Sequence, residues 1–300
     1  MVDKVVKILE EHGPMTGKEL QQKSQLDDFC LWKICNTCGE ITTKAIGKRY
    51  LRFDKQVEGY ARLSPSIVRE FYSYTVIGTK RDIGRILEKT EVLCKNIIDI
   101  SKNKFNLAYE TIRQIVETHE NSEILNKYIC FLIAGDVVFE MAHLEPRPES
   151  STGKLVKGSD LDIVVVTKGL PDSIVNNIDA LIYDKKNFLL KNPDYNEEID
   201  YVVKDISKIK QQLKFDNFKA KIASKVLFES KYLYGNSEMY KKIKQMVKEA
   251  GIPQKMVELE EKAEIERNDA RIYLLKSKAP LSEEESLKLF YTKEEKEEFF

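Results

Sequence analysis

The stretch GSDLDIVVV, residues 158–166, places two aspartates directly before a run of β-branched apolar residues. Such a run predicts a buried strand. Side chains alternate between the two faces of a strand, so we expect Asp160 and Asp162 on one face and Leu161 and Ile163 in the core. Two carboxylates held this close repel each other, which raises a pKa or requires a cation, commonly a divalent metal. The stretch therefore predicts a strand that binds Mg²⁺.

Two further apolar runs accompany this strand along the chain. YICFLIAG, residues 128–135, ends in Gly135, and IDYVV, residues 199–203, carries Asp200 near its start. A helical pattern at 171–190 separates the second and third runs, and such alternation of strands and helices is typical of an α/β layout. Asp200 would add a third carboxylate beside the first two. Three such groups on neighbouring strands predict a two-metal site, which activates a hydroxyl and stabilises a leaving group.

These motifs, in this order, resemble the DNA polymerase β nucleotidyltransferase superfamily. The resemblance rests on AG at 134–135, GSDLDIVVV and IDYVV, and it spans residues 122–250. It implies a domain with a small mixed sheet that moves a nucleoside monophosphate from an NTP, ATP included, to an acceptor hydroxyl and releases pyrophosphate. It also implies that Asp160 and Asp162 bind two ions, Mg²⁺ or Mn²⁺. Asp200 would bind the catalytic ion and orient or deprotonate the nucleophile.

The resemblance also implies where the nucleotide binds. The turn of Gly158 and Ser159 and the start of the helix after Gly135 would face the triphosphate. A helix and a short strand follow the sheet in many members, and residues 223–240 have that pattern. By analogy, two pairs on this helix are candidates for the triphosphate: Ser224 with Lys225, or Lys219 with Lys221. A lysine-rich helix is a solvated surface at least as often.

Asp136 departs from the family pattern, in which Ser or Gly follows the glycine that ends the first strand. An acid caps a helix start well but repels a phosphate placed there. The interval from Gly135 to Asp160 is also longer than usual, and its polar insertion brings Lys154 and Lys157. We keep Asp136 among the predicted nucleotide-binding residues. It also favours a second hypothesis, a nucleotidyltransferase-like domain that has lost turnover and acts as a DNA-binding regulator or partner module.

Residues 1–62 predict a winged-helix-like domain. Helical patterns at 4–12 and 27–38 enclose a second helix, which Thr16 and Glu19 open as a capping box. Two strand-like runs follow, ITTKAIG and KRYLRFDK, and we expect them to pair as a hairpin around Gly47. Three short helices and a hairpin are the element order of a winged helix.

Basic side chains on the expected hairpin favour contact with a phosphate backbone. Tyr50 and Phe53 are interleaved with them, as in many nucleic-acid-binding surfaces. The four basic residues are Lys44, Lys48, Arg49 and Arg52. Against this interpretation, Asp27 and Asp28 open the helix that would enter a groove. Contact with a protein or dimerisation is therefore nearly as well supported.

The remaining segments mainly predict helices. Residues 63–121 are expected to form a helical connector with breaks near Gly78 and at 102–106, and residues 251–300 a C-terminal helical segment whose charged tail faces solvent. Residues 137–145 predict a helix, and 146–159 a loop rich in Pro, Ser and Gly. The expected fold is α/β (α+β), with the nucleotidyltransferase domain at 122–250.

Composition places few limits on function. Basic and acidic residues number 49 each, so net charge favours no class of partner. The first residues lack the apolar core of a secretory signal, and no apolar run approaches about eighteen residues, so we expect a cytoplasmic protein without a membrane partner. Five cysteines without such a signal indicate reduced thiols. Cys30, Cys35 and Cys38 lack a fourth zinc ligand, which favours apolar positions on a helix.

The sequence leaves the acceptor open. RNA ends, a protein side chain, a small molecule and a second nucleotide are all compatible with the same three aspartates, because less patterned flanking segments choose the acceptor. The choice among the NTP bases is open for the same reason.

Overall fold

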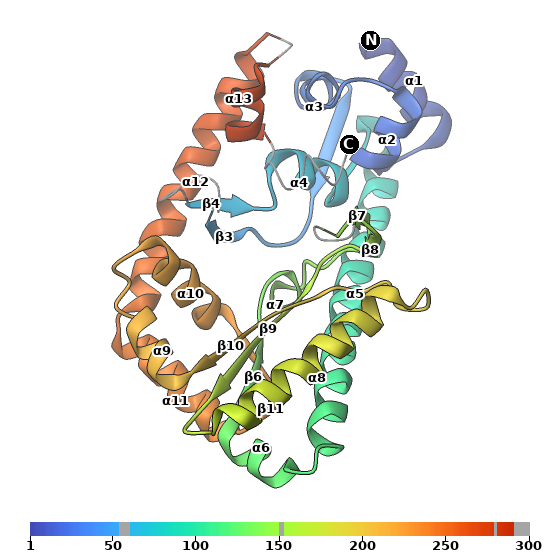
Figure 1. The fold of residues 1–300 in the computed structure, drawn as a ribbon. Helices are drawn as coiled ribbons and strands as arrows, with labels where there is room; N and C mark the ends of the chain where they lie inside the picture. Colours follow the sequence, from blue (N-terminus) through green and yellow to red (C-terminus); the bar gives the residue numbers. More distant parts are fainter. Residues whose placement is uncertain (54–60, 150–152, 279–280, 291–300) are drawn as a thin grey trace. The chain divides into compact units, whose positions relative to one another are not determined.

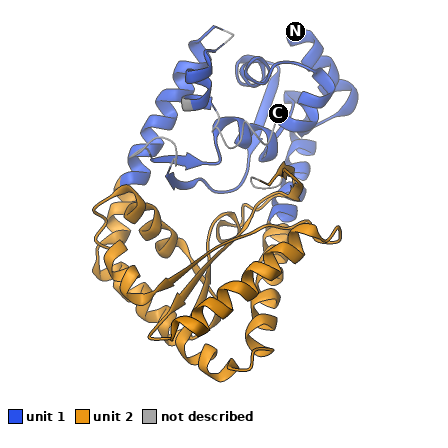
Figure 2. Ribbon diagram, viewed as in Figure 1, with its two compact units in different colours: residues 1–54, 60–97, 259–300 blue, residues 55–59, 98–258 orange. Residues whose placement is uncertain are grey.

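The computed structural model describes residues 1–53, 61–149, 153–278 and 281–290. These residues form two compact units (Figure 2): the first lies within 1–54, 60–97 and 259–300, and the second within 98–258. Each unit has a hydrophobic core of its own. Both mix helices with small sheets, which agrees with the predicted α+β class. Within the described ranges, no helix is long and apolar enough to cross a membrane.

Two long helices contribute to both units. α5 (Ile83–Glu117) and α12 (Ile252–Lys276) each pass from one unit to the other along their length. The predicted helix break at 102–106 is wrong, because α5 continues through it. The polar residue Lys104 is buried there against a carboxylate, and Ala108 follows one turn later in the core, so this stretch has an inward face after all.

The first unit packs short helices against a three-stranded antiparallel sheet in the order β1-β5-β2. The capping box of Thr16 and Glu19 is confirmed at the start of the second helix. Leu9, Leu20 and Trp32 lie in the core of this unit. Its helices and the strands of this sheet are α1 (Val2–His12), α2 (Gly17–Ser24), α3 (Asp28–Thr37), α4 (Ile67–Ser73), β1 (Met15–Thr16), β2 (Ile41–Ala45) and β5 (Thr75–Thr79).

The hairpin expected around Gly47 does not form. β2 pairs instead with β5, and the next strand, β3 (Tyr50–Phe53), pairs with β4 (Ala61–Ser64). β5 falls where we expected helix with a break near Gly78. Its Val76 and Ile77 are fully buried, and a β-branched strand of this kind forms a sheet with β2, while β3, which also buries Tyr50, Leu51 and Phe53, pairs with β4.

The second unit is built on a four-stranded sheet in the order β10-β9-β6-β11. β9 and β10 are parallel and the other neighbours antiparallel, so the sheet is mixed as predicted. The predicted crossover helix is confirmed as α8 (Asp172–Lys191). The strands are β6 (Ile129–Ile133), β9 (Leu161–Thr167), β10 (Ile199–Asp205) and β11 (Lys231–Gly235).

Helices lie on both faces of this sheet (Figure 1). One face carries Ile163 and Val165 of β9 and packs against α8 and the second half of α5. The other face is turned toward three helices that follow β10 and β11. These are α9 (Ile206–Gln212), α10 (Phe218–Glu229) and α11 (Ser237–Glu249).

Two expectations before β9 are corrected. The helix predicted at 137–145 is only the short α7 (Asp136–Phe139), because Glu140 takes a left-handed conformation with φ 61°. The predicted loop at 146–159 contains two short paired strands, β7 (Pro146–Pro148) and β8 (Leu155–Lys157). The remaining elements are η1 (Lys80–Asp82), α6 (Ser122–Tyr128), α13 (Glu283–Glu285) and the π-helix η2 (Ser286–Phe290). The charged tail at 291–300 lies outside the described residues.

Candidate active site

Asp162 and Asp200 are neighbours across two parallel strands. In the register of β9 and β10, Asp200 stands directly opposite Asp162. Paired residues of adjacent strands project to the same face, which here also carries Val202. β10 is an edge strand and Val202 is 41% exposed, so this face is open to solvent beside Asp200. Two of the three predicted carboxylates are therefore brought together at the start of adjacent strands.

Asp162 has an unusual electrostatic environment. Burial, followed by the negative charges of Asp200, Asp136 and Glu229, raises its pKa from 3.8 to about 7, and Lys225 acts in the opposite direction. Three other carboxylates and one lysine thus act on Asp162. A nearby divalent cation would favour the charged form of Asp162 and offset this repulsion.

Gly135 packs directly against the carboxylate of Asp162. Its φ is +70°, and a Cβ at this position would lie 2.0 Å from Asp162 Oδ2. Any side chain would displace the carboxylate or the turn, so the glycine that ends β6 is required by the space around Asp162. This is the position that the family resemblance assigned to the turn beside the triphosphate.

Glu229 is a site residue that the sequence interpretation missed. Its side chain is 3% exposed at the end of α10, and its Oε1 accepts a hydrogen bond from the Gly135 backbone N–H at 3.3 Å. Lys225, one turn earlier, places its Nζ 2.5 Å from Glu229 Oε2. Burial raises the pKa of Glu229, and Lys225 opposes that rise. The i,i+4 spacing of Lys225 and Glu229 was the available signal.

Asp136 is held by Ser159. The Ser159 hydroxyl donates to Asp136 Oδ2 at 2.7 Å and accepts from the His143 backbone N–H at 3.2 Å. At Gly158, φ is +60° and a Cβ would meet the His143 carbonyl oxygen at 1.9 Å. The predicted Gly158–Ser159 turn therefore fastens the segment after α7 to the start of β9.

Asp160 lies immediately before β9, and its carboxylate forms an ion pair with Arg147 of β7. The same guanidinium bonds to Glu198 Oε2 at 2.9 Å and donates from Nε to the Gly158 carbonyl at 2.8 Å. Arg147 is only 12% exposed at its side chain. Arg147 and Glu198 were both missed, because the polar insertion 146–159 gave no pattern that linked it to a strand end.

The third predicted carboxylate is consequently bound to a cation of the chain itself. Among the residues that the structure describes, no three His, Cys, Asp or Glu side chains are grouped to hold a metal ion. The donor chemistry of Asp162 and Asp200 nonetheless fits a hard divalent cation, since paired carboxylate oxygens are its preferred ligands. The raised pKa of Asp162 likewise indicates that negative charge at this site is not fully balanced by positive charge.

The other predicted nucleotide contacts have structural partners. Ser224 is fully buried, and its hydroxyl donates to the Gln212 carbonyl at 3.0 Å, which ties α10 to the end of α9. Lys157 of β8 donates from Nζ to the Asp194 carbonyl at 3.0 Å. Lys154 is exposed next to the undescribed residues 150–152. Of the predicted pair on α10, only Lys225 lies beside the carboxylates.

A buried ion pair supports the start of β10. Lys104 of α5 is 2% exposed, and its Nζ lies 2.5 Å from Glu197 Oε2 and 2.7 Å from the Lys157 carbonyl. Burial lowers the pKa of Lys104 and raises that of Glu197. The pair fixes the segment just before Asp200 to the end of β8.

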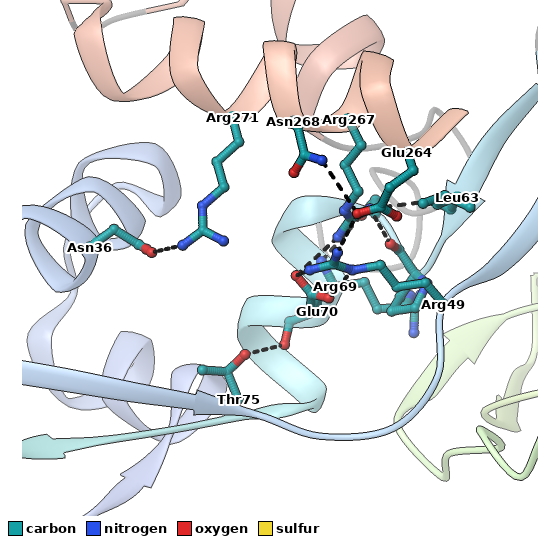
Figure 3. Close-up of polar contacts among 12 residues, drawn as sticks. Asn36, Arg49, Leu63, Arg69, Glu70, Thr75, Glu264, Arg267, Asn268 and Arg271 are labelled. Carbon is teal, nitrogen blue, oxygen red and sulfur yellow. Dashed lines mark hydrogen bonds and ion pairs between the residues drawn. The ribbon is translucent and has the colours of Figure 1, made fainter. Parts of the chain in front are cut away.

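In the first unit, the predicted basic surface is partly engaged internally. Arg49 donates from Nε to Glu70 Oε1 at 2.8 Å and from Nη1 to Glu264 Oε1 at 3.1 Å (Figure 3). Arg267 of α12 also reaches Glu70 Oε2, at 3.0 Å. Lys44 and Lys48 are exposed and Arg52 is half-buried. Arg49 therefore fastens the start of β3 to α4 and α12.

Comparison of the chain with protein-family models, curated proteins and solved structures finds no match. The functional assignment therefore depends on the site itself.

Proposed function

We propose that the second unit is a metal-dependent nucleotidyltransferase. In the proposed reaction an acceptor hydroxyl attacks the α-phosphorus of an NTP. The new bond joins the acceptor oxygen to this phosphorus, the bond to the bridging oxygen breaks, and the hydroxyl proton and pyrophosphate leave. Nucleotidyl transfer needs chiefly the positioning of these groups and the neutralisation of charge.

The single observation that carries this proposal is the register of Asp162 opposite Asp200 at an open sheet edge. Bound Mg²⁺ or Mn²⁺ would supply charge neutralisation for the triphosphate and the developing oxyanion. Asp162 and Asp200 would hold it, with Asp160 as the third ligand once Arg147 releases it. Asp200, the exposed member, would orient the hydroxyl or accept its proton.

The surrounding residues have supporting roles in this proposal. Gly135 leaves room for the Asp162 carboxylate, and Glu229 fixes the Gly135 turn. Lys225 would contribute positive charge to the phosphates. Asp136, bonded to Ser159, would limit how closely a phosphate approaches the start of α7.

Pyrophosphate release from each NTP tests the proposal. It would be measured with Mg²⁺ or Mn²⁺, with and without total RNA, for the wild type, an Asp162→Asn, Asp200→Asn double variant and the exposed control Asp184→Asn. We expect release by the wild type and the control only. Equal release by the double variant would contradict the assignment of the site.

A second function is favoured by one observation, the ion pair between Arg147 and Asp160. A resident guanidinium on a metal-binding carboxylate suits a nucleotidyltransferase-like domain without turnover. The first unit would then act as a winged helix that binds DNA or a protein. Its element order α1-β1-α2-α3-β2, with β1 and β2 in one sheet with β5, is compatible with that topology. Salt-dependent duplex binding without NTP consumption would support this alternative.

A further inference from the structure

Lysines are concentrated in the segment that follows Asp200. Residues 204–225 contain seven lysines and two aspartates, whereas basic and acidic residues are equally numerous in the whole chain. The segment comprises the end of β10, α9 and most of α10, all within the second unit. A local excess of positive charge beside a proposed triphosphate site favours binding of a second, polyanionic ligand.

The first part of this basic surface continues from Asp200 along β10. Asp200, Val202 and Lys204 alternate with core-facing residues, so they share the open face of the strand. Lys204 lies close enough to Lys208 of α9 for the two positive charges to interact, and burial together with that repulsion lowers the pKa of Lys204. Because neighbouring positive charges repel each other, a bound anion would stabilise this arrangement of lysines.

The second part continues from Lys225 along α10. Lys225 acts on Asp162, and Lys221 precedes it by one helical turn on the same side. The Nζ atoms of Lys221 and Lys255 lie 5.8 and 4.9 Å from the centre of the Phe215 ring. The bond from Ser224 to the end of α9 joins the two parts.

We call Lys204, Lys208, Lys214, Lys221 and Lys255 the basic strip. Within the described part of the chain, none of these five lysines forms an ion pair with an acidic side chain. By contrast, Lys225 pairs with Glu229, and Lys241 pairs with Glu238. The strip therefore keeps its positive charge available to a ligand.

We propose that the basic strip binds the phosphodiester backbone of a single-stranded nucleic acid whose terminal hydroxyl is the acceptor. This inference rests on the proposed nucleotidyl transfer. A strand carries one negative charge per nucleotide, which matches a row of lysines that begins at the carboxylate pair. The seven residues of α9 alone extend about 10 Å along the helix axis, further than one phosphate group of a small acceptor reaches.

Binding of a labelled 20-nucleotide single-stranded RNA to the full chain tests the strip. Single-stranded DNA of the same sequence and a polyglutamate peptide of equal charge serve as the other probes. The strip variant is Lys208→Gln, Lys214→Gln, Lys221→Gln. The matched control, Lys185→Gln, Lys186→Gln, Lys191→Gln, removes the same charge on α8, on the opposite face of the sheet.

We expect the strip variant to bind RNA or DNA at least about tenfold more weakly, and its salt slope to fall by about 2, near 0.7 per lost phosphate contact. The control should bind like the wild type. Equal losses in both variants, or tighter binding of polyglutamate than of either nucleic acid, would overturn the proposal.

Transfer measured on the same proteins separates the two proposals. Nucleic-acid binding that depends on the strip, without transfer by the wild type, supports the strip and contradicts only the chemistry. Transfer to a protein or small molecule that the strip variant performs normally overturns the strip and leaves the chemistry intact. Loss of transfer to an RNA or DNA end in the strip variant alone supports both.

Discussion

Among single residues, Asp162 should make stability depend on pH. The pKa of Asp162 is raised in the folded state, so its protonated form stabilises the fold. This contribution is fully present below pH 3.8, the ordinary pKa of the group, and is lost as pH rises through about 7. Asp162→Asn carries no charge to bury. In the absence of divalent cations, we expect the variant to gain about 1–3 kcal/mol over the wild type between pH 4 and 8. Urea unfolding at several pH values measures this difference. A difference that stays constant with pH would contradict the environment described for Asp162.

Gly135 offers a second test at this scale, with Gly169 as its matched control. Both have positive φ, but a Cβ at Gly169 meets nothing within 4 Å, whereas at Gly135 it meets Asp162. Backbone strain alone should cost Gly169→Ala about 1 kcal/mol. Gly135→Ala should cost about 3 kcal/mol or more, because the carboxylate must also move. Equal unfolding free energies for the two variants would show that the Asp162 carboxylate does not press on the turn.

The sequence predicted the aspartates of the site better than their partners. Strand alternation and the order of the apolar runs were enough to expect Asp200 beside the other two aspartates, and the structure added the register that pairs it with Asp162. Arg147 was missed because the polar insertion that carries it gave no pattern, and Glu229 because α10 is distant from Gly135 along the chain. The position of Asp160 just before the strand, rather than on it, allows its carboxylate to turn toward Arg147.

At the scale of elements, the paired strands β7 and β8 carry Arg147 to the strand ends. Arg147→Gln would leave Asp160 and Glu198 without their cation and should destabilise the second unit by about 3 kcal/mol. Mg²⁺ should then raise the melting temperature of the variant more than that of the wild type, since the ion can replace the lost charge. Arg147→Lys, which keeps the charge, should respond less. Identical Mg²⁺ responses in all three proteins would contradict a shared role of Arg147 and the metal.

Element prediction failed where a segment's partner was distant in the sequence. β3 was predicted to pair with β2 because the two are adjacent in sequence. In the structure β2 pairs instead with β5, which carries the buried Val76 and Ile77. In α5, the polar residue Lys104 favoured a predicted break in the helix. Its burial is explained by its ion pair with the carboxylate of Glu197. Strands such as β9 and β10 were predictable because a continuous apolar run is itself the signal.

At the scale of the whole molecule, the two cores should lose structure separately. The single tryptophan, Trp32, is buried in the first core and stacks on Phe29 with ring centroids 6.1 Å apart. Ile163 is 1% exposed in the second core. Ile163→Ala should destabilise the second unit by about 3 kcal/mol. The urea midpoint of unfolding followed by far-UV circular dichroism should then fall, while the midpoint followed by Trp32 fluorescence should not change. A fall of both midpoints by the same amount would mean that α5 and α12 couple the units into one cooperative transition.

The central claim is that the Asp162–Asp200 pair supports transfer of a nucleoside monophosphate, and the fate of two labels tests it most directly. NTP labelled at the α- or γ-phosphate would be supplied with Mg²⁺ or Mn²⁺ and single-stranded RNA or DNA to the wild type, Asp200→Asn and Asp184→Asn. We predict that the α label joins the acceptor and the γ label leaves in pyrophosphate, for the wild type and Asp184→Asn but not for Asp200→Asn. Transfer of the γ label to the acceptor, or undiminished transfer by Asp200→Asn, would contradict the account.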